Sequence, residues 1–216
     1  MDAAVLLLAE RGLRGVSLRE INEAAGQRNT NALHYHFGDR EGLIRALGTR
    51  HTAELGSIQQ RLFEQCRADG TVDDLRTLLG LLQRPLAEYV EVGPVQAAWV
   101  RVAAQLLTSP RTATEDVVAA VPEVAVVVGR AIIDQLSPPL PEDLAVRRLQ
   151  AVSESAVHLV ADRARLAHTK KKVSRDHTRM ALFTAELLDL SAAALRAPVS
   201  EETGALLRQA PAATPS

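Results

Sequence analysis

Apolar residues recur at the three- and four-residue spacing of an amphipathic helix along most of this 216-residue chain. The clearest stripes lie at Leu75, Leu78, Leu79, Leu82, Leu86 and Val90 and at Met180, Phe183, Leu187, Leu190 and Ala194. Aromatic residues make up only 3% of the chain, so its core must be built from small and aliphatic side chains, which suit helix packing. The sequence therefore predicts an all-α fold. Residues 117–136 are rich in β-branched side chains and also fit a strand by propensity, but we predict a helix there.

The composition is that of a globular protein, with 47% hydrophobic and 24% charged residues. Cys66 is the only cysteine, and no basic segment precedes an apolar run at the amino end, so we expect a cytoplasmic protein. The most apolar stretch, residues 117–133, is interrupted by Pro122, Glu123 and Arg130, and we expect no membrane segment. The net charge of -1 offers no general attraction to nucleic acid, so any such function must depend on a local site.

Signals for starting and stopping helices follow one another closely within the first fifty residues. A first helix is expected over residues 2–11. Ser17 and Glu20 have the spacing of a capping box, which predicts a second helix that ends near Gly26. Asn29 is placed to cap a third helix over residues 30–37. Two short helices around a tight turn are typical of a helix-turn-helix, whose second helix enters the major groove of DNA.

The third helix has the side chains that such a role requires. Leu33 and Phe37 lie four residues apart and share the face expected to pack inward. Asparagine can bind adenine through paired hydrogen bonds, threonine can contact a thymine methyl group, and histidine and tyrosine can reach phosphates. The opposite face carries Thr30, Asn31, His34 and Tyr35. Arg19, near the start of the preceding helix, can approach a base or a phosphate, and Arg40 is placed to meet backbone phosphate.

These residues resemble the tetracycline-repressor (TetR) family of bacterial transcriptional regulators. The resemblance covers about fifty residues and depends on segments 9–12 (AERG), 15–21 (GVSLREI), 24–26 (AAG) and 33–43 (LHYHFGDREGL). It implies base contacts from Arg19, Thr30, Asn31 and Ala32 and phosphate contacts from His34, Tyr35, His36 and Arg40. Residues 27–29 form a turn one residue longer than is common in the family, which makes Arg28 a further candidate contact.

The resemblance also implies how the rest of the chain is organised. A helix-turn-helix domain over residues 1–46 is expected to precede a helical effector-binding and dimerisation domain over residues 47–197, with about nine helices in all. Residues 198–216 are rich in Pro, Ser, Thr and Ala and are predicted to be a disordered tail. Two long helices, 142–167 and 175–196, are expected to pack against those of a second copy as a four-helix bundle.

Candidate effector contacts are weaker, and each has a structural alternative. Glu154, His158 and Asp162 lie four residues apart on one helix face; a polar seam or surface is favoured over effector contact, and a metal site is the least favoured. Gln96 and Trp99 lie among apolar residues and fit either a binding pocket or the core. His34 and His36 diverge on a helix and are a poor metal pair. No catalytic, cofactor or metal-binding motif is recognised, so we expect neither an enzyme nor a cofactor.

Two functional hypotheses follow. The first is a homodimeric repressor that binds palindromic operator DNA through half-sites roughly 34 Å apart and is released by a small-molecule effector. The alternative is a helical ligand-binding or scaffolding protein whose DNA-reading head is non-functional. It is motivated by the net charge of only +1 over residues 1–50, by the longer turn and by the abbreviated amino end.

Overall fold

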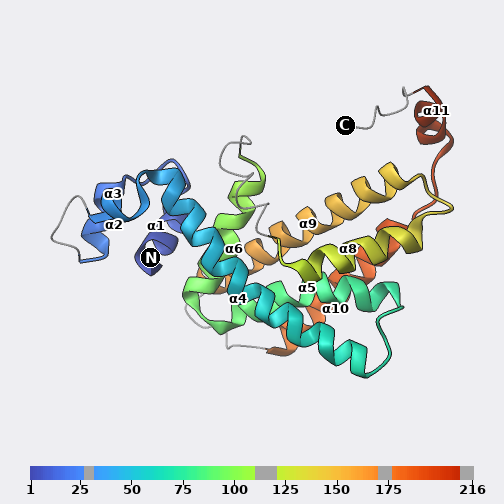
Figure 1. The fold of residues 1–216 in the computed structure, drawn as a ribbon, viewed down its shortest axis with the longest axis horizontal. Helices are drawn as coiled ribbons and strands as arrows, with labels where there is room; N and C mark the ends of the chain where they lie inside the picture. The colour runs from blue at the N-terminus through green and yellow to red at the C-terminus, as the bar shows by residue number, and fades with distance from the viewer. Residues whose placement is uncertain (27–31, 110–120, 170–176, 210–216) are drawn as a thin grey trace.

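The computed structural model describes residues 1–26, 32–109, 121–169 and 177–209, which contain ten helices and no strand (Figure 1). The all-α prediction is confirmed. In the segment with strand propensity, the described residues form a helix that begins at Glu123, and residues 117–120 lie outside the described part of the chain. The helices are α1 Asp2–Arg11, α2 Leu18–Ala24, α3 Ala32–Phe37, α4 Arg40–Ala68, α5 Leu75–Val92, α6 Pro94–Leu107, α8 Glu123–Leu136, α9 Glu142–Thr169, α10 His177–Arg196 and α11 Glu201–Gln209.

Helices α1 to α3 and the start of α4 form a head at one end of the molecule (Figure 1). The predicted capping box at the start of α2 is present: Ser17 Oγ accepts from the Glu20 amide at 3.3 Å, and Glu20 Oε2 accepts from the Ser17 amide at 2.8 Å. Asp39 caps α4 by accepting from the Gly42 amide at 2.8 Å. Local side-chain chemistry therefore sets where these helices begin. The predicted cap Asn29 lies outside the described residues.

Helix α4 joins the head to the remaining helices, which we call the body (Figure 1). It has 29 residues and crosses the predicted domain boundary between residues 46 and 47 without a break. In its first turns Leu43, Ile44 and Leu47 are buried in the head. The apolar stripe continues at the half-buried Leu55 and Ile58, which pack against the same core. One continuous helix therefore belongs to both parts of the molecule.

A proline inside α5 explains one of the contacts between α4 and α5. Pro85 has no amide hydrogen, so it cannot donate to the carbonyl of Leu81 four residues earlier. The buried side chain of Gln59, on α4, donates from Nε2 to this carbonyl at 3.0 Å. The hydrogen bond that α5 loses at Pro85 is thus replaced by one from α4, and the two helices are held in register.

Two apolar clusters form the interior. The first extends from the head into the body: it contains Val5 and Leu8 of α1, Val102 and Leu106 of α6, and Val160 of α9. The second lies within the body and contains Leu79 of α5, Ile132 of α8 and Leu188 of α10. The head therefore shares its core with α6 and α9 and does not pack as a separate unit.

Helix α11 corrects the expectation that residues 198–216 are disordered. Ser200 Oγ accepts from the Thr203 amide at 3.2 Å, and Glu201 and Glu202 lie in the first turn, where negative charge is favourable. None of the residues of α11 is buried. A low apolar content favours disorder, but these local signals are sufficient for a short exposed helix. Residues 210–216 lie outside the described part.

Within the described ranges, no helix has the length and apolar character needed to cross a bilayer.

Removing the cap of α2 should destabilise the head. We expect Ser17→Ala to lower the free energy of unfolding by about 1 kcal/mol, because the Glu20 amide at the start of α2 loses its acceptor and the Glu20 carboxylate loses the hydrogen bond from the Ser17 hydroxyl. Urea unfolding followed by circular dichroism measures the change. Ser57→Ala is the matched control, since the exposed Ser57 hydroxyl only donates back to the Ala53 carbonyl within α4. Equal effects of the two substitutions would contradict the importance of the capping box.

Candidate nucleic-acid interface

Helix α3 lies at the tip of the head, away from the body (Figure 1). Tyr35 is 86% exposed, and His36 is also exposed, with its ring edge-on to that of Tyr35 at 5.4 Å between centroids. Phe37 is half-buried and packs against the core, which is the inward role that the sequence predicts for it. The described residues of α3 therefore present an aromatic and polar side to solvent and an apolar side to the head.

The remaining predicted contacts of this helix are not all described. Arg28, Thr30 and Asn31 lie outside the described residues. Ala32 and His34 belong to α3, but the structure describes only the backbone of these two residues.

Arg19 lies on the exposed side of α2. Its Nε forms an ion pair with Glu23 Oε1 at 2.9 Å, and the two side chains are 81% and 61% exposed. The hydrogen bond to Glu23 raises the pKa of Arg19. Exposed pairs one helical turn apart contribute little to stability, so this pair can be exchanged for a contact with DNA.

Arg40 is directed inward, toward the start of α2. Its Nη1 donates to the carbonyl of Val16 at 2.6 Å, and its Nη2 is buried. The guanidinium thus ties the first turn of α4 to the residue before the α2 cap. The sequence predicts a phosphate contact for Arg40 and gives no sign of this inward contact, because the two residues are 24 positions apart in the chain.

Residues 1–47 match the family model described as bacterial regulatory proteins, tetR family. The matched segment is the head, with its capped α2 and exposed α3. The head of the chain is therefore similar to TetR-family regulators over these residues. No curated protein is similar enough to the chain to match it. The body, from residue 48 onward, lies outside this match.

The body holds the carboxyl end of α1 through two side chains of α6. Arg101 Nη2 donates to the Ala9 carbonyl at 2.7 Å, and Gln105 Oε1 accepts from the Leu13 amide at 3.1 Å. These contacts satisfy backbone groups at the end of α1 and in the following turn, which a helix cannot satisfy internally.

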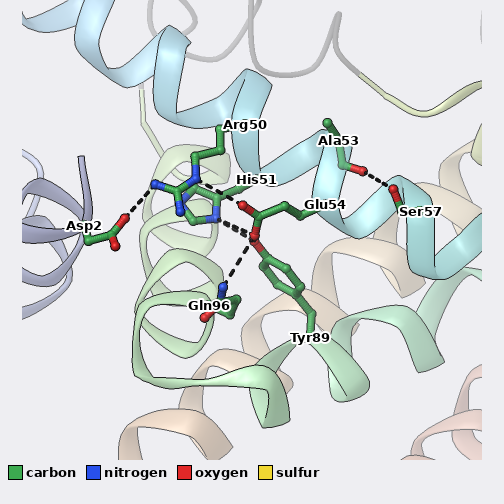
Figure 2. Close-up of polar contacts among 8 residues, drawn as sticks. All are labelled: Asp2, Arg50, His51, Ala53, Glu54, Ser57, Tyr89 and Gln96. Carbon is green, nitrogen blue, oxygen red and sulfur yellow. Dashed lines mark hydrogen bonds and ion pairs between the residues drawn. The ribbon is translucent and has the colours of Figure 1, made fainter.

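A polar network holds the amino end of the same helix (Figure 2). Arg50 on α4 pairs with Asp2 on α1 at 2.6 Å and with Glu54 at 3.0 Å. The second carboxylate oxygen of Glu54 accepts from the Tyr89 hydroxyl at 2.7 Å and from Gln96 Nε2 at 3.5 Å. Burial raises the pKa of Glu54, but the hydrogen bonds from Tyr89 and Arg50 outweigh it and leave that pKa below its usual value. Four helices, α1, α4, α5 and α6, therefore meet in this network.

His51 is the buried end of the network. The residue has no exposed surface, its Nδ1 lies 2.5 Å from the Tyr89 hydroxyl, and its ring stacks on Trp99 with centroids 4.7 Å apart. Because Tyr89 donates its proton to Glu54, His51 Nδ1 is the donor to the tyrosine oxygen. Burial lowers the pKa of His51, with Glu54 acting against it, so the ring is held neutral.

The predicted effector residues do not come together. Trp99 is 5% exposed and belongs to the core, and Gln96 contacts Glu54 in the network. On α9, Glu154 accepts from Gln150, Asp162 pairs with Arg165, and His158 is exposed. Among the described residues no group of three possible metal ligands is found. These three positions fit the alternative of a polar helix surface.

An open groove of about 720 Å³ lies between α4 and α8, at a place that the sequence analysis did not identify. At its base Gly56 lets α4 approach α8 closely, since a β-carbon there would lie 3.3 Å from Pro122. The lining is mixed, with apolar residues beside two carboxylates and Arg61, which pairs with Glu88. The lining residues are Ala53, Gly56, Ser57, Gln60, Arg61, Phe63, Glu64, Pro122, Glu123, Val124 and Val127.

Burial of neutral His51 should make stability depend on pH. Below pH 6.5, the ordinary pKa of histidine, the unfolded chain takes up a proton at His51 that the folded chain does not. The free energy of unfolding should therefore fall as the pH drops, by at most about 1.4 kcal/mol per pH unit. Urea unfolding between about pH 7.5 and pH 5.5 measures this slope and stays above the range in which Glu54 titrates.

His51→Gln should reduce the slope, whereas the matched variant His158→Gln, at an exposed position on α9, should retain it. A slope that His51→Gln leaves unchanged would show that other groups cause it.

Proposed function

We propose that this regulator is a ligand-responsive repressor that binds palindromic operator DNA as a homodimer and is released by a small molecule. The observation that carries the proposal is the exposure of α3, with Tyr35 86% exposed at the tip of the head and Arg19 exposed on α2. A short helix with a free polar side, positioned by a packed apolar side, is what major-groove recognition requires.

On this proposal α3 enters the major groove, and the residues at its start contact base edges. Phosphate contacts position the head, and base contacts provide sequence preference. Arg40 acts through the head itself, because its guanidinium holds α2 against α4. The base contacts come from Arg19, Arg28, Thr30, Asn31 and Ala32, and the phosphate contacts from His34, Tyr35 and His36.

Dimerisation through α9 and α10 is supported by the large aliphatic side chains that these helices leave in solvent. Leu159 and Leu166 on α9 are 46% and 43% exposed, and Leu182 and Leu190 on α10 are 68% and 63% exposed. Two copies related by a two-fold axis would bury these residues in a four-helix bundle. The same symmetry would present two α3 helices to the two halves of a palindrome.

The α4–α8 groove supports the ligand response, because its lining combines apolar side chains with polar and charged groups that could orient a small molecule. The DNA would be released by a ligand that binds more tightly to a dimer whose two α3 helices no longer match the spacing of the operator half-sites. The size of the effect is set by the ratio of the ligand's affinities for this dimer and for the DNA-binding dimer. None of the candidates Gln96, Trp99, Glu154, His158 and Asp162 is among the residues that line the groove. We therefore propose the groove in their place.

Gel shift against the upstream region of the regulator's own gene tests DNA binding, at about 0.1 M and 0.2 M salt. We expect the operator to be bound much more tightly than random DNA, with affinity that falls steeply as salt rises. Arg19→Met should reduce the preference for operator by about 1–3 kcal/mol, because a base contact is lost. Arg84→Met, at an exposed position on α5, is the control for the lost charge.

Equal affinity of the wild-type regulator for operator and random DNA would favour a ligand-binding or scaffolding protein with a non-functional head.

The dimer interface can be tested separately from DNA. Sedimentation velocity should give the mass of two chains for the wild-type regulator, and Leu190→Asp should shift it to one chain because a charge would be buried in the bundle. Leu206→Asp on α11 is the matched control, since Leu206 is 60% exposed and Leu190 is 63% exposed. If both variants sediment with the mass of two chains, Leu190 is not part of the dimer interface.

A further inference from the structure

Helix α1 is held at its two ends by different parts of the body. At the carboxyl end, Arg101 and Gln105 of α6 bind backbone groups of Ala9 and Leu13. At the amino end, Arg50 on α4 binds the Asp2 carboxylate. The ten residues of α1 span about 15 Å, so the two attachments are well separated. Together they fix both the position and the direction of the helix.

We propose that Arg50 is a positioning residue that sets the angle of the DNA-binding head on the body. The α6 contacts and the shared apolar core act as the fixed point, and the Arg50–Asp2 pair sets the direction of α1 about it. Arginine is suited to this because its planar guanidinium can bind two carboxylates at once, through Nη1 to Asp2 and through Nε to Glu54.

The other contacts of Glu54 make this angle depend on the body. The same carboxylate that binds Arg50 accepts from Tyr89 of α5 and Gln96 of α6 (Figure 2). A change in the placement of α4 against α5 must therefore alter the position of the Arg50 guanidinium. The Asp2 side chain is 56% exposed and the Arg50 side chain is 37% exposed, so water can hydrate both groups when their ion pair is broken. Such a pair can be broken at small cost, which suits a contact that differs between two states.

The groove lies beside this network on the same helix. Ala53 and Ser57, which line the groove, lie on the side of α4 away from Tyr89 (Figure 2). A molecule in the groove would thus press on α4 within one helical turn of Glu54. The regulatory consequence depends on the proposed function, whereas the attachment of the head does not.

Hydrogen–deuterium exchange of the α1 amides, in the full chain without DNA, tests the attachment. Arg50→Met should make these amides exchange about fivefold faster, because the amino end of α1 loses its anchor. Asp2→Asn should have the same effect, and the double variant should exchange no faster than either single variant. Exchange in α8, α9 and α10 should be unchanged.

Arg76→Met is the matched control. Arg76 forms an ion pair between α5 and α10 at 2.8 Å, its side chain is 41% exposed, and the pair lies outside the head. It should leave α1 exchange unchanged. If Arg50→Met does not fold, Arg50→Lys keeps the charge but cannot bind two carboxylates in the same way, and it should still accelerate exchange in α1. Exchange in α1 that equals the wild-type value in both Arg50 variants would overturn the proposal.

Operator binding distinguishes positioning from contact with DNA. Arg50→Met should weaken operator binding about tenfold relative to Arg76→Met and leave the dependence of affinity on salt unchanged, because no phosphate contact is lost. A salt slope reduced by about 0.9 would show that Arg50 touches phosphate and would overturn the positioning role. If the wild-type chain shows no preference for operator DNA, the proposed function fails, and the exchange experiment still decides the role of Arg50.

Discussion

The packing of α1 against α6 is the contact on which the arrangement of the whole molecule depends. Val5 and Leu8 of the head share one apolar core with Val102 and Leu106 of the body, so the head cannot turn freely without exposing apolar surface. The family match ends at residue 47, but the packing does not. The limit of the matched sequence is therefore not a limit of the folded unit, and the DNA-binding surface is positioned by residues far outside the matched segment.

What the sequence predicts well are features decided within one or two helical turns. The Ser17–Glu20 capping box acts over three residues, so its signal can be recognised without any tertiary information. The outward side of α3 follows from the four-residue spacing of its apolar positions. The same principle applies to α11, where Ser200 and the acidic first turn are local helix signals in a segment whose composition favours disorder.

Contacts between residues distant in the chain could not be predicted in this way. The sequence does not show that Arg40 turns toward Val16, or that Trp99 stacks on His51 in the core. Both contacts depend on how the helices pack. The groove likewise exists only where α4 passes α8. One long-range contact did leave a signal: Pro85 within a predicted helix implies an unsatisfied carbonyl at Leu81, and a buried donor such as Gln59 is then required.

Along α4, polar contacts join the apolar ones where the helix enters the body, and this difference bears on how the head can move against the body. In the head, α4 is held by apolar contacts of residues such as Leu43 and Leu47, which are non-directional and tolerate small shifts. In the body Leu55 and Ile58 continue these apolar contacts, and hydrogen bonds are added to them. Glu54 accepts from the Tyr89 hydroxyl, and Gln59 donates to the Leu81 carbonyl. Buried polar groups are costly unless paired, so α4 cannot slide gradually past α5. A change in its placement must exchange one set of hydrogen bonds for another, which favours two discrete positions of the head over a continuous range.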